Sequence, residues 1–219
     1  MEYRYAEKCG YEDFASGRVL YHYRGVPNFP VRLINEIYNR CLEYSNKKED
    51  LCLYDCCCGG GYSLTVLGFL NQQSISKIIA SDIDYKMLEI AKANLSLLSR
   101  DGLKRRIDEL HLLYERFNKT SHKDAEESAI KLLNMIQKDI DVQLFQMNIL
   151  QDIQIDISPD IVITDIPYGD LATWQGGTGT VSRLLESLTK ICTNETIIAI
   201  CSDKKQKINC ERFKRLEKQ

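Results

Sequence analysis

The sequence predicts an α/β fold in which helices cover both faces of a mainly parallel sheet. Short apolar runs typical of buried strands alternate along the chain with longer segments of helical spacing. Two of these runs end in distinctive turns, which is where open parallel sheets bind their ligands. The composition, 44% hydrophobic and 27% charged, is that of a globular protein with a full core, and the 219 residues fit one domain over residues 1–219.

The expected elements follow in chain order. Residues 1–48 form an arm with a short helix and then a helix over 31–44, entered at Pro30. Strands are expected at 51–55, 77–82, 141–146, 160–165 and 196–203. Further helices are expected at 62–70, 84–98, 103–118, 122–140 and 180–191. Because a crossover between parallel strands needs only one helix, the helical pair within 103–140 is predicted to be an insertion.

Charge and cysteine content narrow the class of protein. A net charge of −2 argues against a generic nucleic-acid coat, but residues 100–123 carry seven basic and four acidic residues, and 203–219 carry seven and three. Such clusters can contact phosphate, or they can be ordinary solvated faces. Nine scattered cysteines, an odd number, favour reduced thiols over a disulfide framework. Neither a membrane-length apolar run nor a secretion signal is evident, so we expect a cytoplasmic protein.

Three consecutive glycines, Gly59, Gly60 and Gly61, lie between an expected strand and an expected helix. At this position glycine permits a close ligand approach, and the helix start offers free N–H groups. No Lys follows Gly61 as in a P-loop, and Leu64 breaks the dinucleotide fingerprint. Asp82, 21 positions after Gly61, has the spacing of a carboxylate that accepts both ribose hydroxyls. The pattern favours a nucleoside without a pyrophosphate, and S-adenosylmethionine (SAM) is the leading candidate, with Asp55 near its cationic amino-acid end.

The cysteines beside the glycines are not predicted to bind metal. Cys56, Cys57 and Cys58 contain no C-x-x-C spacing, and no histidine lies at zinc-finger spacing from them. Small polarizable side chains at a strand end pack well beneath a cofactor. We therefore expect these thiols to line the site as unliganded packing.

A second motif, TDIPYG at residues 164–169, lies at the carboxyl end of another expected strand. Asp165 and the carbonyl of Ile166 can accept both hydrogens of an exocyclic amino group. Pro167 stiffens the turn, and Tyr168 can stack on a planar base or amide. The motif is predicted to position a nitrogen for methyl transfer.

Together the motifs DCCCGGG (55–61), SDID (81–84) and DIPYG (165–169) resemble those of class I SAM-dependent amino-methyltransferases, which carry D-P-x-C-G-S-G and [DN]-x-P-Y signatures. More specifically, the chain resembles the avilamycin-resistance 23S rRNA methyltransferase family (AviRa). The segments that carry this resemblance are CGYEDFASGRVLY (9–21), FPVRL (29–33), CCGGGY (57–62), LTVLG (64–68), IASDID (79–84), NLSLLS (94–99) and TDIPYG (164–169).

The resemblance implies a Rossmann-like class I methyltransferase fold that acts on a guanine of 23S rRNA, with the exocyclic N2 as the expected atom. It also implies residue roles. The implied SAM contacts are Asp55, Cys57, Gly59, Gly60, Gly61, Asp82, Ile83, Asn148 and Ile149. The implied catalytic residues, which hold the target base, are Asp165, Ile166, Pro167 and Tyr168.

An rRNA substrate also implies a surface that contacts RNA. The arm mixes basic and aromatic side chains, a combination suited to phosphate contact and base stacking. The candidate RNA-binding residues are Arg4, Arg18, Tyr21, Arg24, Arg32, Arg105, Arg106 and Trp174. The resemblance implies 23S rRNA or the large ribosomal subunit as the partner, and the protein is expected to be a monomer. An arm that merely covers the core stays open.

The chain departs from the family pattern at four places. Cys56 replaces the usual Pro, Gly60 the usual Ser, and Asn148 the usual Asp that faces the adenine. The chain stops at RFKRLEKQ, so the usual C-terminal β-hairpin is expected to be short or missing. Two other functions stay open: a protein glutamine-amide N-methyltransferase, and a non-catalytic SAM-fold module that binds RNA.

Overall fold

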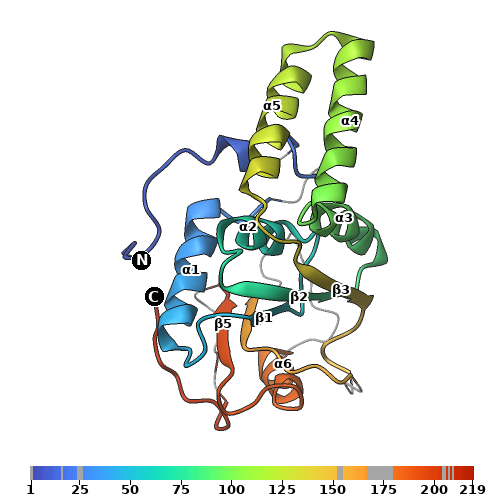
Figure 1. The fold of residues 1–219 in the computed structure, drawn as a ribbon. Coiled ribbons are helices and arrows are strands. Elements are labelled where there is room, and N and C mark those ends of the chain that lie inside the picture. Colours follow the sequence, from blue (N-terminus) through green and yellow to red (C-terminus); the bar gives the residue numbers. More distant parts are fainter. Residues whose placement is uncertain are drawn as a thin grey trace.

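The computed structural model describes residues 2–15, 17–23, 27–151, 155–166, 180–203, 206, 208 and 210–219. Within them a single sheet has five parallel strands in the order β3-β2-β1-β4-β5 (Figure 1). The strands are β1 Leu51–Asp55, β2 Ile75–Asp82, β3 Asp141–Gln146, β4 Ile161–Asp165 and β5 Ile197–Cys201. This order confirms the predicted parallel α/β sheet. It also creates a topological switch between β1 and β4, where such sheets bind ligands.

The helices confirm the predicted elements: α1 and α2 have the predicted ends, and the ends of the others are shifted. They are α1 Val31–Tyr44, α2 Tyr62–Leu70, α3 Tyr85–Ser96, α4 Arg100–Phe117, α5 Thr120–Met135 and α6 Thr180–Leu188, with a short 3-10 helix, η1, at Glu12–Phe14. None of these described helices is long and apolar enough to cross a bilayer.

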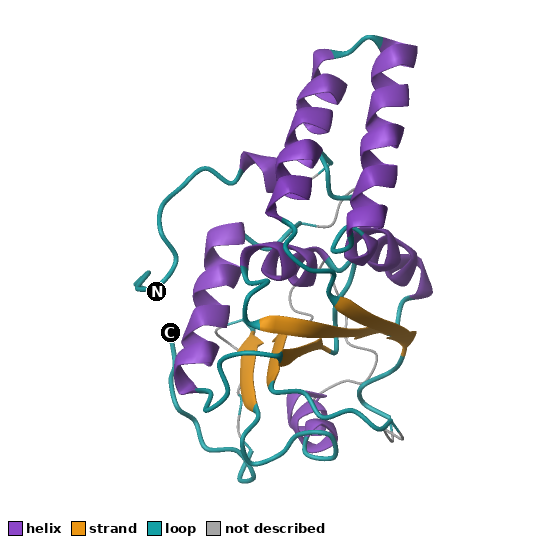
Figure 2. Cartoon of the chain, viewed as in Figure 1, coloured by secondary structure: helices purple, strands orange, loops and turns teal. Residues whose placement is uncertain are grey.

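The inserted pair α4 and α5 forms a hairpin that projects away from the sheet (Figure 2). Helix α4 begins three residues before the predicted start, because the Ser99 hydroxyl caps it by accepting the Gly102 N–H at 3.1 Å. Helix α5 begins two residues early and ends at Met135, so the prediction of a helix to residue 140 was wrong. Ile136 leaves the helix with extended backbone and is buried, and the Gln137 N–H is held by the Gln72 side chain at 2.8 Å.

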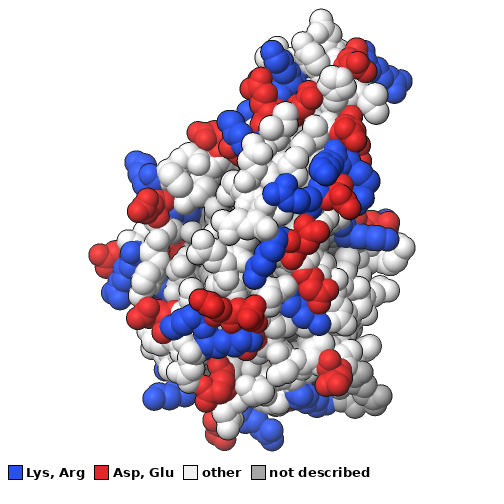
Figure 3. Space-filling model, in the orientation of Figure 1, with Lys and Arg blue, Asp and Glu red and all other residues white. Residues whose placement is uncertain are grey.

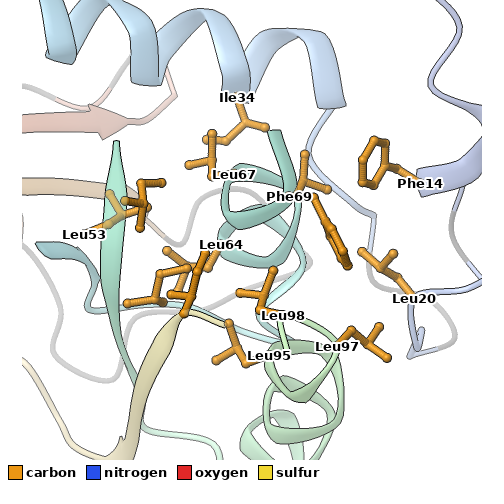
Figure 4. Close-up of a cluster of buried hydrophobic side chains, with 14 of the residues drawn as sticks. Phe14, Leu20, Ile34, Leu53, Leu64, Leu67, Phe69, Leu95, Leu97 and Leu98 are labelled. Atoms are coloured by element: carbon orange, nitrogen blue, oxygen red, sulfur yellow. The ribbon is translucent and has the colours of Figure 1, made fainter. Parts of the chain in front are cut away.

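Two hydrophobic clusters lie on opposite faces of the sheet, because side chains alternate along each strand. On β1, for example, Leu53 belongs to the larger cluster and Tyr54 to the smaller. Figure 4 shows the larger cluster, to which α1, α2, α3 and the arm contribute. Helix α6 packs in the smaller cluster on the other face.

The arm is part of this core. Phe14, Val19 and Leu20 are buried in the larger cluster, and the rings of Phe14 and Phe69 lie 5.9 Å apart. Asp13 accepts a 2.6 Å hydrogen bond from the Ser128 hydroxyl of α5. The arm therefore joins the inserted hairpin to the sheet.

Strand β5 is the last strand of the described part of the chain and lies at one edge of the sheet. The residues described after it contain no further strand, so no C-terminal hairpin is present among them. Instead, Ile208, Cys210 and Phe213 pack against the smaller cluster. Glu217 pairs with Arg40 of α1, and both chain ends lie beside that helix (Figure 1).

Candidate active site

Three carboxylates stand at the carboxyl ends of neighbouring strands. Asp55 ends β1, Asp82 ends β2 and Asp165 ends β4, and β1 lies between the other two. Parallel strands end at the same edge of a sheet, so these side chains converge. Asp82 and Asp165 lie close enough to Asp55 for their charges to contribute, after burial, to its raised pKa.

Asp55 is the most buried of the three carboxylates. Burial, the largest cause, raises its pKa from 3.8 to about 7. The Cys57 N–H, at 3.0 Å, and the Thr164 hydroxyl donate to Asp55 and partly oppose this shift. A buried carboxylate of this kind is stabilised by a cationic ligand, which favours its ionised form.

Asp82 connects the end of β2 to the glycine loop. Its Oδ2 accepts the Gly59 N–H at 2.8 Å, and its Oδ1 accepts the Asp84 N–H at 2.9 Å. The Ile83 N–H also donates to this carboxylate. A carboxylate has about four acceptor positions, so at least one remains for a ribose hydroxyl. Asp84 in turn caps α3 by accepting the Lys86 N–H at 2.8 Å.

The three glycines of the loop meet different surroundings. Gly59 and Gly61 have positive φ angles of 50° and 70°. A Cβ on Gly61 would lie 3.1 Å from the Ala91 backbone, and one on Gly60 would lie 3.2 Å from Ile90. A Cβ on Gly59 would meet nothing closer than 3.8 Å. Gly59 therefore lies on the open side of the loop, whereas Gly60 and Gly61 face α3.

Helix α2 begins at this loop with Gly61 as its N-cap and without a side-chain cap. Its first-turn N–H groups face the loop without a capping side chain to accept from them. Together with the helix dipole, such a helix start favours a bound carboxylate.

The remaining implied cofactor residues follow β2 and β3. Ile83 presents an exposed apolar side chain directly after Asp82, whereas Ile149 is buried in the smaller cluster. The Asn148 oxygen accepts the Leu150 N–H at 3.0 Å, so this side chain shapes its own turn.

The cysteines beside the loop are largely buried among the packed side chains of the site. All nine cysteines of the chain are free thiols. The thiol pKa of Cys58 is raised by burial, and that of Cys57 by a hydrogen bond with Cys56 and by burial. In the described ranges no three His, Cys, Asp or Glu residues are grouped to hold a metal ion.

Only part of the predicted catalytic motif falls within the described residues. Asp165 is half-buried, and Ile166 is buried with its N–H donating to the Cys201 carbonyl at 3.1 Å. Pro167, Tyr168 and Trp174 lie outside the described residues, as does Arg24 of the arm.

The candidate RNA-binding residues divide into two groups. Arg4 and Arg105 are exposed. The four other candidates within the described residues make hydrogen bonds inside the protein: Arg18 donates to the Asp124 carbonyl at 3.3 Å, Arg32 donates to the Ala6 carbonyl at 3.0 Å, Tyr21 donates to Glu109 at 2.8 Å, and Arg106 donates to the Val19 carbonyl at 2.9 Å. Figure 3 shows that basic and acidic side chains are interspersed on the visible face.

One residue at the site was missed from the sequence. Asn94 of α3 is fully buried and donates to the carbonyl of Gly60 at 2.8 Å. The signal for it is modest: among the buried residues of α3, Asn94 is an amide beside the apolar Leu88, Ala91 and Leu95.

Comparisons with known proteins assign the family. A family model described as "rRNA methyltransferase AviRa" matches residues 1–219. A Streptomyces viridochromogenes protein named 23S rRNA (guanine(2535)-N(1))-methyltransferase is 37% identical over 99% of this chain and 90% of its own length. Two solved structures of rRNA methyltransferase AviRa from that organism, at 1.5 and 2.4 Å, superpose with TM-scores of 0.87 and 0.86. Each is 35% identical and covers 99% of this chain and 91% of the solved chain. The fold and the motifs at its strand ends thus agree with one family, and this chain belongs to the AviRa rRNA methyltransferases.

Proposed function

We propose that this protein methylates a guanine of 23S rRNA, with SAM as the methyl donor. The observation that carries the proposal is the 37% identity, over 99% of the chain, to a protein named as a 23S rRNA guanine methyltransferase. Membership in an rRNA methyltransferase family favours rRNA over a glutamine amide as substrate, and an enzyme over a non-catalytic binding module.

The residues at the strand ends fit SAM. Asp82 keeps at least one acceptor position for a ribose hydroxyl, and Gly59 leaves its side of the loop open. The uncapped start of α2 suits the carboxylate of the methionine part, and buried Asp55 suits its cationic groups. Cys57, Gly60, Gly61, Ile83, Asn148 and Ile149 complete the proposed cofactor-binding set. SAM supplies an electrophilic methyl group, and the protein contributes alignment, worth up to ~7–11 kcal/mol.

The atom that receives the methyl group is the finer question. The motif around Asp165 favours N2, whereas the name of the Streptomyces relative gives N1. The two nitrogens are neighbours on the Watson–Crick edge of guanine, so one pocket can present either. N1 carries a proton at neutral pH, and a carboxylate at the end of β4 can accept that proton. We therefore propose N1 as the target and Asp165 as the proton acceptor.

The other proposed roles follow from the substrate. Ile166, Pro167 and Tyr168 would hold the guanine, which must leave its stack to reach the edge of the sheet. We expect the protein to act as a monomer in the cytoplasm, where ribosomes are. A methyl group on 23S rRNA can obstruct a drug that binds there, so resistance to such an antibiotic is the expected cellular effect.

The test is methyl transfer from radiolabelled SAM to 23S rRNA and to intact large subunits, followed by mass spectrometry of the nucleosides. We expect 1-methylguanosine, and loss of about 10²-fold or more of the rate with Asp165→Asn. A product of N2-methylguanosine would reject the N1 assignment alone. The proposal as a whole fails if neither substrate is labelled while the folded protein binds SAM.

A further inference from the structure

The side chain of Asn94 lies between the arm and the glycine loop. It is fully buried in α3. Its amide nitrogen donates to the Gly60 carbonyl at 2.8 Å and to the Tyr21 carbonyl at 3.0 Å, and its oxygen accepts the Tyr21 N–H at 2.7 Å. One side chain therefore contacts the backbone of two segments that are far apart in the sequence.

The orientation of this amide is fixed by its partners. Two carbonyls require donors and one N–H requires an acceptor, and only one orientation of the amide supplies both. Both amide hydrogens are used, one on each segment. A shift of Tyr21 away from Asn94 would therefore disturb the hydrogen bond to Gly60 as well.

Tyr21 also docks on the inserted hairpin. Its hydroxyl donates to Glu109 at 2.8 Å, and the Arg106 guanidinium lies 4.3 Å from its ring centre. Arg106 further donates to the Val19 carbonyl at 2.9 Å and pairs with Glu109 at 3.0 Å. A continuous chain of contacts thus leads from α4 through the arm and Asn94 to the loop.

We propose that Asn94 is a positioning residue that couples docking of the arm to the conformation of the glycine loop. An rRNA that holds the arm against α4 then strengthens SAM binding, and SAM strengthens rRNA binding by the same factor. The inference rests on the proposed function for the identity of both ligands. The contacts that join α4, the arm, Asn94 and the glycine loop do not depend on the identity of the ligands.

The first experiment measures the loop in the protein without ligands. Hydrogen exchange of residues 56–62 is compared among wild type, Asn94→Ala and Arg106→Ala. We expect faster exchange in both variants, because each loosens one end of the link. The matched control is Gln72→Ala, which removes another buried amide that bridges two segments, from Phe69 to Gln137. It should leave exchange at 56–62 unchanged.

The second experiment measures binding by calorimetry. Loss of one buried hydrogen bond, on the order of 1.4 kcal/mol, corresponds to about tenfold weaker SAM binding in Asn94→Ala. Arg106→Ala should weaken binding about threefold on its own but add nothing in the Asn94→Ala background. In wild type, an rRNA fragment should bind more tightly when S-adenosylhomocysteine, a non-reactive ligand, is present than when it is absent. In Asn94→Ala, S-adenosylhomocysteine should leave the rRNA affinity unchanged.

The outcomes separate the two proposals. Unchanged loop exchange and unchanged SAM affinity in Asn94→Ala, or additive effects of the two substitutions, would overturn the coupling. If Asn94→Ala does not fold, Arg106→Ala decides, and wild-type exchange and SAM affinity in that variant reject the proposal. If wild type binds no SAM, the proposed function fails, and the exchange experiment still tests the link.

Discussion

The glycines of the loop can be told apart by single substitutions. Gly61 combines a φ of 70° with an Ala91 backbone atom 3.1 Å from the position of an added Cβ. Gly59 has a φ of 50°, but a Cβ added there would lie 3.8 Å from the nearest side-chain atom, which belongs to Met87. Gly61→Ala should therefore destabilise the fold by about 2–3 kcal/mol, and Gly59→Ala by about 1 kcal/mol. Urea denaturation of the two variants measures both values.

Asp55 gives a prediction on pH. Its pKa rises from 3.8 in the unfolded chain to about 7 in the folded protein, mainly by burial. Between these two pH values the Asp55 carboxyl is protonated in the folded state but ionised in the unfolded state. The contribution of Asp55 to stability is therefore full below pH 4 and is lost as the pH rises through 7. The free energy of unfolding should lose on the order of 3–4 kcal/mol over this range because of Asp55.

The measurement is denaturation of the ligand-free protein at several pH values from 4 to 8, with Asp55→Asn as the reference. The variant does not titrate at this position, so the difference between the two curves isolates Asp55. A difference that does not change with pH would show that the Asp55 carboxyl keeps its ordinary pKa.

At the scale of single residues, the sequence predicts the side chains that stand at strand ends. It does not predict the side chains that hydrogen-bond to the backbone of distant segments. Asp55, Asp82 and Asp165 follow apolar runs, so the sheet must bring them to one edge. Asn94 and Arg106 bond to main-chain carbonyls of distant segments. Such partners have no side-chain signature, and Arg106 is therefore indistinguishable in sequence from an exposed arginine.

At the scale of elements, helix α1 bonds to segments near both ends of the chain. Buried Glu36 accepts the N–H groups of Arg4, Tyr5 and Ala6 at 2.8–2.9 Å and pairs with Arg40 at 2.8 Å. Burial alone would raise the pKa of Glu36, but these hydrogen bonds bring it below its usual value. Arg40 also pairs with Glu217.

Glu36→Gln should destabilise the protein by about 2–4 kcal/mol, because an amide cannot accept all four hydrogen bonds and leaves Arg40 partly uncompensated. Thermal or urea unfolding measures the loss. Glu115→Gln, which breaks an exposed contact with His111 on α4, is the control and should change stability by less than about 0.5 kcal/mol. Equal effects of the two substitutions would contradict the role of Glu36.

The strands were predicted closely because their apolar runs are short and bounded by polar residues. The error at the end of α5 has a physical reason. Ile136 and Ile140 fit the apolar face of a longer helix, but both are buried in the larger cluster from the non-helical segment that leads into β3. Tertiary packing, not local pattern, decides where that helix ends.

At the scale of the whole molecule, the strand order and the docking of the arm could not be predicted. Both depend on contacts between segments far apart in sequence, such as the pairing of β1 with β4 for the strand order and that of Tyr21 with Asn94 for the arm. Their outcome matters for function: the arm, the inserted hairpin and the glycine loop form one connected body. An arm that is part of the core can still present exposed cations to RNA.

This arrangement separates two neighbouring arginines that look alike in the sequence. Arg105 is exposed on α4, whereas Arg106 is held by Val19, Tyr21 and Glu109. If α4 faces rRNA, Arg105→Ala should weaken rRNA binding and reduce the slope of log affinity against log salt by about 1, because one phosphate contact is lost. Arg106→Ala should weaken rRNA binding through the arm, with the slope unchanged.

The control is Lys48→Ala, which removes a cation just before the amino end of β1. It should change neither the rRNA affinity nor the slope. Filter binding to an rRNA fragment at several salt concentrations measures both, and a slope that Arg105→Ala leaves at the wild-type value would place the RNA on another face of the molecule.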